Sequence, residues 1–259
     1  MSARLHAVLR RERDRTSPSV HLAVERRSDP MAPKPSRADR DFGAKTWSCV
    51  TDAASVTTRR AERLESILEA DLFALADADP QVTDVETQVR LPHSGKDKFV
   101  DFRLTLSRAD GTVVGVIGIE VKPDDVAERT GFDDDVRAME RAMPVGWADR
   151  ILRFGESDIR SGPLLANAKR IAWARACLPP KALVADVSNF VPSNRPVRLS
   201  EIVDAFDDPL AVEAVMVLVG RGLLRPAKRT PSLDLDPFLF RGTPDQPSSA
   251  VSLQLGRFL

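Results

Sequence analysis

The sequence predicts an α/β protein in which a mixed sheet is flanked by helices, because helix-like and strand-like segments alternate over most of its 259 residues. Two observations set this pattern. Asp110-Gly111 separates two strand-like runs, and Asp-Gly is a strong short-range signal for a β-hairpin. Between positions 57 and 76, apolar residues recur at spacings of three and four, as on one side of a helix: Leu64, Ile67, Leu68, Leu72 and Leu75.

The next elements follow from the pattern in chain order. The helix is predicted to end at 77–80, and residues 82–91 alternate well enough between apolar and polar to form a strand. The hairpin strands are predicted at 98–107 and 112–122. The second of these is apolar on both faces, which is typical of a central strand that is covered on both sides.

A helix, a strand and a further helix are expected after Pro123. The first helix passes through Val136 and Met139, the strand covers 148–154, and the last helix lies within 159–173. Prolines at 179–180 and 192–196 then mark a boundary in the chain.

A second, smaller unit is predicted at 197–245. Two short amphipathic helices, 199–206 and 209–219, precede two extended runs that begin at Leu223 and Asp234. Helix, turn, helix and a two-stranded wing is the layout of a winged helix, so we expect a winged-helix-like C-terminal domain.

These patterns divide the chain into five parts. We predict a basic, disordered arm at 1–45, a main domain at 46–178, a linker at 179–196, the winged-helix-like domain at 197–245 and a loose tail at 246–259. The arm is rich in arginine and poor in large apolar side chains, so burial cannot offset the entropy lost on ordering. Its arginines either contact a phosphate backbone or keep the arm solvated.

Composition narrows the classes of function. Lys and Arg number 38, as do Asp and Glu, whereas a protein that holds long DNA by itself usually carries excess positive charge. A role on DNA would therefore depend on delivery by a partner. We expect no membrane association, because no stretch is long and apolar enough to cross a bilayer. The two cysteines and three histidines lack metal-ligand spacing, which favours reduced thiols and a cytoplasmic protein, located at the nucleoid when it acts on DNA.

The predicted hairpin brings two carboxylates and a lysine together. If Asp110-Gly111 is a two-residue turn, the register puts Asp101 opposite Glu120, with Cβ atoms about 5 Å apart. Lys122 lies two residues further on, on the same side of the strand. Two carboxylates and a cation then share one patch of the sheet.

Facing carboxylates on a central strand repel each other unless a cation lies between them or one takes a proton. Mg²⁺ prefers such oxygen ligands, and Mn²⁺ could substitute for it. A bound metal would lower the pKa of a water and stabilise the oxygens of a phosphate, while the lysine would orient that water or offset charge in the transition state. A salt-bridged patch with a purely structural role is the alternative that these residues leave open.

This arrangement resembles the PD-(D/E)xK nuclease core, with Asp101 and Glu120-Val121-Lys122 as its motif. This motif alone also occurs in many unrelated proteins, and the segment upstream makes the resemblance more specific. The chain looks like the amino-terminal domain of TnsA-type transposon endonucleases over residues 57–160. The residues that carry this likeness are Ser66-Ile67-Leu68-Glu69, Phe73, Val82-Thr83-Asp84-Val85, Gln88 and Val121-Lys122-Pro123.

The resemblance implies a restriction-endonuclease-like fold and an Mg²⁺-dependent endodeoxyribonuclease. By position, Glu69 matches the helical acidic residue of the family, Asp101 the central metal ligand and Glu120 the second ligand. Lys122 matches the catalytic lysine. Gln88 matches a position whose side chain contacts the metal ligands and not the metal itself.

The sequence also departs from the family. Val100 stands where many members have proline, and Val89 stands where an aromatic residue or proline often follows the glutamine. Glu65 could replace Glu69 as the helical carboxylate, although Glu69 has the better motif context.

The resemblance further implies a role in transposition. The protein would cut double-stranded DNA at the 5′ ends of a mobile element as one subunit of a heteromeric transposase. The partner would be a subunit of the integrase-like class that processes the 3′ ends, and an AAA+ regulator is allowed as a further partner. Two rival hypotheses remain: a nuclease of DNA defence or repair, and an inactive nuclease fold that serves as a scaffold for DNA or protein.

A basic cluster near the C-terminus is a candidate DNA contact. It has no acidic residue among its members, which either follow DNA phosphates or form an ordinary wing surface: Arg221, Arg225, Lys228 and Arg229.

Overall fold

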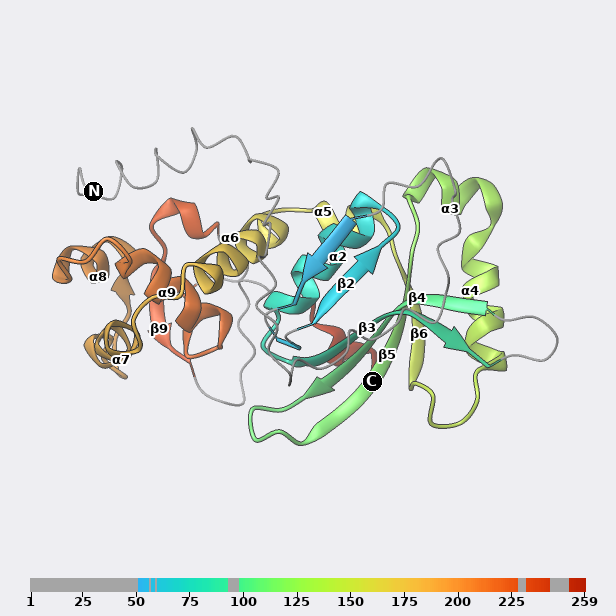
Figure 1. Ribbon diagram of the computed structural model, residues 1–259, viewed down its shortest axis with the longest axis horizontal. Helices are drawn as coiled ribbons and strands as arrows, with labels where there is room; N and C mark the ends of the chain where they lie inside the picture. The colour runs from blue at the N-terminus through green and yellow to red at the C-terminus, as the bar shows by residue number, and fades with distance from the viewer. Residues whose placement is uncertain (1–50, 56, 59, 93–97, 228–231, 243–251) are drawn as a thin grey trace, which may run out of the picture.

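The computed structural model describes residues 51–55, 57–58, 60–92, 98–227, 232–242 and 252–259 (Figure 1). The basic arm predicted at 1–45 lies outside these ranges. None of the helices within them is long and apolar enough to span a membrane.

A four-stranded mixed sheet forms the centre of the larger part of the molecule, in the order β3-β4-β5-β6. Its strands are β3 (Val82–Leu91), β4 (Lys98–Ser107), β5 (Val113–Val121) and β6 (Arg150–Phe154). The first three are antiparallel neighbours, and β6 runs parallel to β5. The predicted mixed sheet is confirmed, and β5 holds the central, largely buried position expected from its sequence.

Helices cover both faces of this sheet. On one face, the apolar stripe of α2 (Ile67–Ala78) shares the main hydrophobic core with Ile117 and Ile119 of β5. On the opposite face Trp147 lies against Gly118, and α4 (Phe132–Ala142) completes a smaller core. The short helix α3 (Asp124–Thr130) connects β5 to α4. The predicted α/β class with helices on both sides of the sheet is therefore confirmed (Figure 1).

The first helix begins later than predicted, and this is a correction. Residues 61–64 form strand β2 (Ala61–Leu64), which pairs with β1 (Thr51–Ala54) instead of continuing the helix. Ser66 is the N-cap of α2, and its hydroxyl accepts a hydrogen bond from the Glu69 N–H. Ser-x-x-Glu is a helix-start signature, so the motif that carries the family resemblance also fixes where the helix begins.

The smaller part of the molecule contains a second sheet, in the order β7-β9-β8. The helices α5 (Glu156–Arg160) and α6 (Leu164–Ala176) lead into it. Its elements, in chain order, are α7 (Lys181–Phe190), β7 (Val197–Arg198), α8 (Leu199–Ala205), α9 (Ala211–Gly220), β8 (Leu224–Pro226) and β9 (Phe238–Arg241).

The predicted linker at 179–196 is wrong for most of its length, because residues 181–190 form α7. Leu183, Val184 and Val187 of this helix are buried in the main core. Pro180 directly precedes the helix, and proline is tolerated at a helix start, where no backbone hydrogen bond is lost. The prolines therefore begin a helix here and do not mark an exposed connection.

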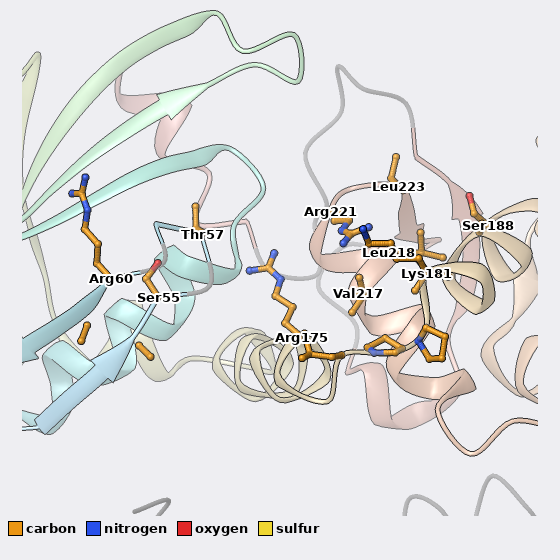
Figure 2. A pocket seen from close by; sticks show the side chains of 17 residues that line it. Ser55, Thr57, Arg60, Arg175, Lys181, Ser188, Val217, Leu218, Arg221 and Leu223 are labelled. Carbon is orange, nitrogen blue, oxygen red and sulfur yellow. The ribbon is translucent and has the colours of Figure 1, made fainter. Parts of the chain in front are cut away.

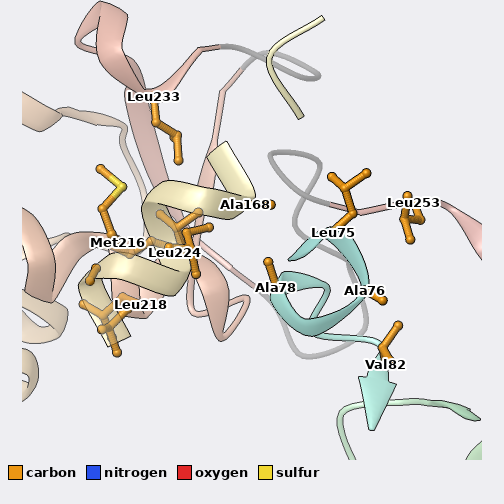
Figure 3. Packing of buried hydrophobic residues seen from close by; sticks show 14 of the residues in the cluster. Leu75, Ala76, Ala78, Val82, Ala168, Met216, Leu218, Leu224, Leu233 and Leu253 are labelled. Atoms are coloured by element: carbon orange, nitrogen blue, oxygen red, sulfur yellow. The ribbon is translucent and has the colours of Figure 1, made fainter. Parts of the chain in front are cut away.

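One hydrophobic core joins the two parts. It contains residues of α2 and the central sheet together with residues of α6, α7 and α9. Figure 3 shows part of it, with Leu75 and Ala78 of α2, Ala168 of α6 and Met216 of α9. The helix α9 is buried along nearly its whole length against α6 and α7.

The C-terminal tail is also corrected. We predicted a loose segment at 246–259, but residues 252–259 pack on the larger part of the molecule. Leu253 and Leu255 are buried, and the Leu253 N–H donates to the carboxylate of Asp79 at 2.8 Å. The short helix η2 (Leu255–Phe258) lies beside β5.

Candidate active site

The hairpin register that we predicted for Asp101 is present, although the turn differs. Ala109, Asp110 and Gly111 form a three-residue connection, because the Arg108 N–H donates to the Thr112 carbonyl oxygen at 2.9 Å. The predicted two-residue turn is therefore wrong. An irregularity between Leu106 and Ser107 shifts the pairing back by one residue.

Beyond that irregularity the pairs follow the predicted register as far as Phe102 and Ile119. Asp101 and Glu120 are the next residues along the two strands, so they lie opposite each other where the paired stretch ends. The longer turn and the irregularity offset each other, so Asp101 and Glu120 are neighbours as the predicted register requires.

Asp101 is half-buried, and each of its two carboxylate oxygens accepts one hydrogen bond. Its Oδ1 accepts from Gln88 Nε2 at 3.2 Å, and its Oδ2 accepts from the Val121 N–H at 2.8 Å. Burial, and after it the negative charge of Glu69, raise the pKa of Asp101 to about 7, while the two hydrogen bonds oppose the rise. The carboxylate is thus held in place, but its charged form is poorly stabilised.

Glu120 is also buried, with 8% of its surface exposed. Burial and the charge of Asp101 raise its pKa to about 9, and Glu69 adds to the rise. Lys122 and Lys98 oppose it. Among the described residues, Glu120 Oε1 has no hydrogen-bond partner. A buried acceptor without a partner is costly, and it indicates that a proton or a cation belongs at this oxygen.

Glu69 joins the cluster from the first turn of α2. Its carboxylate accepts from the Glu65 N–H and from Ser66 Oγ, each at 2.9 Å. Burial raises the pKa of Glu69, and these hydrogen bonds together with one from Gln88 oppose the rise. Glu65 adds its negative charge nearby, but its side chain is less buried than that of Glu69. The structure therefore places Glu69, as predicted, beside Asp101.

Gln88 contacts the carboxylates of both Asp101 and Glu69. It is 1% exposed, and its side chain hydrogen-bonds Asp101 and Glu69. Its backbone φ is 50°, in the left-handed region that residues other than glycine rarely adopt. The strained backbone directs one amide to two of the acidic side chains.

Lys122 follows β5 directly and lies near Glu120, whose pKa its charge lowers. The Nζ atom is 5.0 Å from the centre of the Phe132 ring at the start of α4, which is a cation–π distance. The Lys122 N–H donates to the Phe154 carbonyl oxygen at 3.1 Å, so the residue is tied to β6. One more cation, Lys98 at the start of β4, also acts on Glu120. Sequence reasoning missed Lys98, because a separation of three residues from Asp101 on the same strand predicts that the two side chains lie on opposite faces.

The carboxylate oxygens of the cluster are the atoms that could bind a divalent metal. Within the described ranges, no group of three or more His, Cys, Asp or Glu side chains forms a metal-binding set as it stands. The oxygens of Glu69 and Asp101 accept hydrogen bonds from donors of the protein. Each carboxylate oxygen has a second lone pair, and Glu120 Oε1 has no partner among the described residues. An all-oxygen donor set of this kind fits Mg²⁺ or Mn²⁺.

The predicted basic cluster is only partly visible. Lys228 and Arg229 lie outside the described residues. Arg225, on β8, lies over the Phe240 ring at 5.9 Å. Arg221 follows α9 and lines a groove whose walls do not include the carboxylate cluster.

No family model and no curated protein matches this sequence.

Proposed function

We propose that this chain is a metal-dependent DNA endonuclease of the TnsA type, which cuts the 5′ ends of a mobile element beside a separate transposase subunit. The observation that carries the proposal is the convergence of Glu69, Asp101 and Glu120 on one buried patch, with Lys122 next to it. The charge of Glu69 raises the pKa of Asp101 and of Glu120, and the charge of Asp101 raises that of Glu120 further. Such a concentration of negative charge is suited to a cation that arrives with a substrate.

The architecture supports the proposal at two further points. The carboxylates come from a helix and from two neighbouring strands of a mixed sheet, which is the arrangement that the PD-(D/E)xK resemblance implies. In the smaller part, helix α7, strand β7, helices α8 and α9 and strands β8 and β9 follow the order of a winged helix, with β9 between β7 and β8. Both features favour the restriction-endonuclease-like and winged-helix-like assignments.

Each residue has a distinct task in this proposal. Glu69, Asp101 and Glu120 would hold the metal, and Gln88 keeps the first two oriented through its amide. When bound, Mg²⁺ would supply Lewis-acid stabilisation of the scissile phosphate and lower the pKa of the attacking water. Lys122 would place its ammonium group beside the negative charge that develops on the phosphate oxygens.

A strand-specific cleavage assay tests this function. The protein is mixed with its transposase partner, DNA that carries an element end, and Mg²⁺. We expect wild type to cut the 5′ strand, and Asp101→Ala and Lys122→Ala to lower the rate by about two orders of magnitude or more. Glu128→Gln, which removes an exposed acidic side chain on α3, is the matched control and should cut normally. Equal cutting by wild type and both site variants would show the assignment to be wrong.

A further inference from the structure

A groove of about 1350 Å³ lies at the junction of the two parts of the molecule, away from the carboxylate cluster. Its walls come from the β1–β2 hairpin, the end of α6, the start of α7 and the end of α9. This volume exceeds the range of about 300–1,000 Å³ that is usual for small-molecule pockets. The groove is therefore suited to a larger ligand.

The charged side chains of this groove are all basic. Four cations come from four different elements, and none of the described residues that line the groove is acidic: Arg60, Arg175, Lys181 and Arg221. In Figure 2, Arg60 lies on the side of the hairpin, Arg175 lies between the two parts, and Arg221 and Lys181 lie on the side of α7 and α9. The cations are spread along the groove and do not converge on one point.

The described residues neutralise this positive charge only in part. The side chains of Arg221 and Lys181 form no hydrogen bond or ion pair with any described residue, and both residues are exposed. Among the described residues, Arg60 forms a long ion pair with Asp84, at 3.9 Å, and its charge also lowers the pKa of Glu62. Burial lowers the pKa of Arg175, Asp77 opposes this, and the like charge of Arg221 lowers it further. The groove thus brings like charges together, which an anionic ligand would relieve.

The groove and the carboxylate cluster lie at opposite ends of α2. Ser55 and Thr57 line the groove and hydrogen-bond the carboxylate of Asp77 in the last turn, whereas Glu69 is in the first turn. At a rise of about 1.5 Å per residue, these two acidic residues are about 12 Å apart along the helix axis. That is about the length of three or four phosphate spacings on one DNA strand.

We propose that this groove binds the phosphate backbone of double-stranded DNA a few nucleotides from the site of cleavage, an inference that rests on the proposed nuclease function. The contacts are to phosphates and would carry no sequence information. A basic groove also fits a chain with zero net charge, because the positive charge is concentrated where the substrate lies.

Fluorescence anisotropy with a labelled duplex of about 30 base pairs, without metal and at about 50 mM salt, tests this inference. We expect the double variant Lys181→Gln/Arg221→Gln to bind about tenfold more weakly than wild type, and the slope of log affinity against log salt to fall by about two. Two unrelated duplex sequences should bind equally. Arg195→Gln, an exposed arginine in the loop before β7, is the matched control and should bind as wild type does. Unfolding midpoints of all variants establish that the fold is retained.

Three outcomes would overturn the groove assignment: equal affinity of wild type and the double variant, an equal loss in the Arg195 variant, or no duplex binding by wild type at low salt. The last result would favour an acidic protein surface as the occupant. The binding assay contains no metal, so it is independent of cleavage. Loss of duplex binding in the double variant together with an absence of cutting by wild type would refute the nuclease and leave the groove standing.

Discussion

At the scale of single residues, Gln88 combines a strained backbone with hydrogen bonds to the carboxylate cluster. A residue with a side chain at φ of 50° carries strain of about 1–3 kcal/mol, and such strain persists where the surroundings hold it. Here the strained residue hydrogen-bonds two carboxylates that would otherwise repel each other. Glycine would relax the backbone at this position, but it would lack the amide that hydrogen-bonds Asp101 and Glu69.

Asp79 gives a prediction on pH. It is fully buried at the end of α2, and burial raises its pKa from 3.8 to about 6 despite hydrogen bonds from Gln81, Leu253 and Ser252. The native state therefore keeps a proton that the unfolded chain loses above pH 3.8. The resulting contribution to stability is present below that pH and is lost as the pH rises through about 6.

We expect the free energy of unfolding of wild type to fall relative to that of Asp79→Asn between pH 4 and 7, by at most about 3 kcal/mol. Urea unfolding of both proteins at several pH values measures the difference. A difference that does not change over this range would contradict the raised pKa. Asp110→Asn, at an exposed turn, controls for the general effect of removing a carboxylate.

At the scale of elements, the start of α2 serves both the fold and the candidate site. Ser66 Oγ accepts from the Glu69 N–H and donates to the Glu69 carboxylate, so one hydroxyl caps the helix and orients a proposed ligand. We expect Ser66→Ala to lower the free energy of unfolding by about 1 kcal/mol, as is usual for loss of an N-cap. Chemical denaturation measures this change. Ser66→Thr keeps the hydroxyl and should stay close to wild type, and an equal loss in both variants would argue against the cap.

Arg175 links the ends of two helices from different parts of the molecule. Its guanidinium donates to the carbonyl oxygen of Asp77 at 2.7 Å, near the end of α2, and to that of Gly220 at 2.9 Å, at the end of α9. Each bond is charge-assisted, and both carbonyl groups lie where a helix leaves acceptors without partners.

Arg175→Ala should therefore lower the free energy of unfolding by about 3 kcal/mol or more, whereas Arg195→Ala, at an exposed position, should change it little. Guanidinium denaturation followed by circular dichroism and by tryptophan fluorescence measures both variants. If Arg175→Ala unfolds at the wild-type midpoint, the two hydrogen bonds do not hold the parts together.

At the scale of the whole molecule, the burial of α9 limits how the smaller part can act. In helix-turn-helix proteins the second helix enters the major groove of DNA, but here α9 packs against α6 and α7. A winged-helix-like unit in this arrangement cannot read bases with that helix. Specificity would then come from a partner, which agrees with the zero net charge and with the backbone contacts proposed for the basic groove.

Patterns that depend on local chemistry predicted much of this molecule. The apolar run of β5 identified a central strand, and the hairpin placed Asp101 opposite Glu120 even though the turn was wrong. Register along most of the hairpin survived because an irregularity near Leu106 compensated for the longer turn. The residue pattern around Leu106 does not predict this irregularity.

Features that depend on distant contacts were missed. The tail at 252–259 is ordered by burial of Leu253 and Leu255 against elements more than a hundred residues away. The helix α7 followed a Pro-Pro pair that also suits a linker, and only its contacts with α9 distinguish the two. The basic groove likewise gathers cations from positions 60 to 221, so no segment of the sequence contains it.

The central claim, that the carboxylate cluster is a metal site, is tested most directly by calorimetric titration of Mg²⁺ and Mn²⁺ into the metal-free protein. We predict that wild type and Glu128→Gln bind both ions, and that Asp101→Asn loses binding because it removes the carboxylate that faces Glu120. Proton release on binding should accompany it, since the pKa values of Asp101 and Glu120 are raised to about 7 and about 9. No binding by wild type, or equal binding by Asp101→Asn, would contradict the claim.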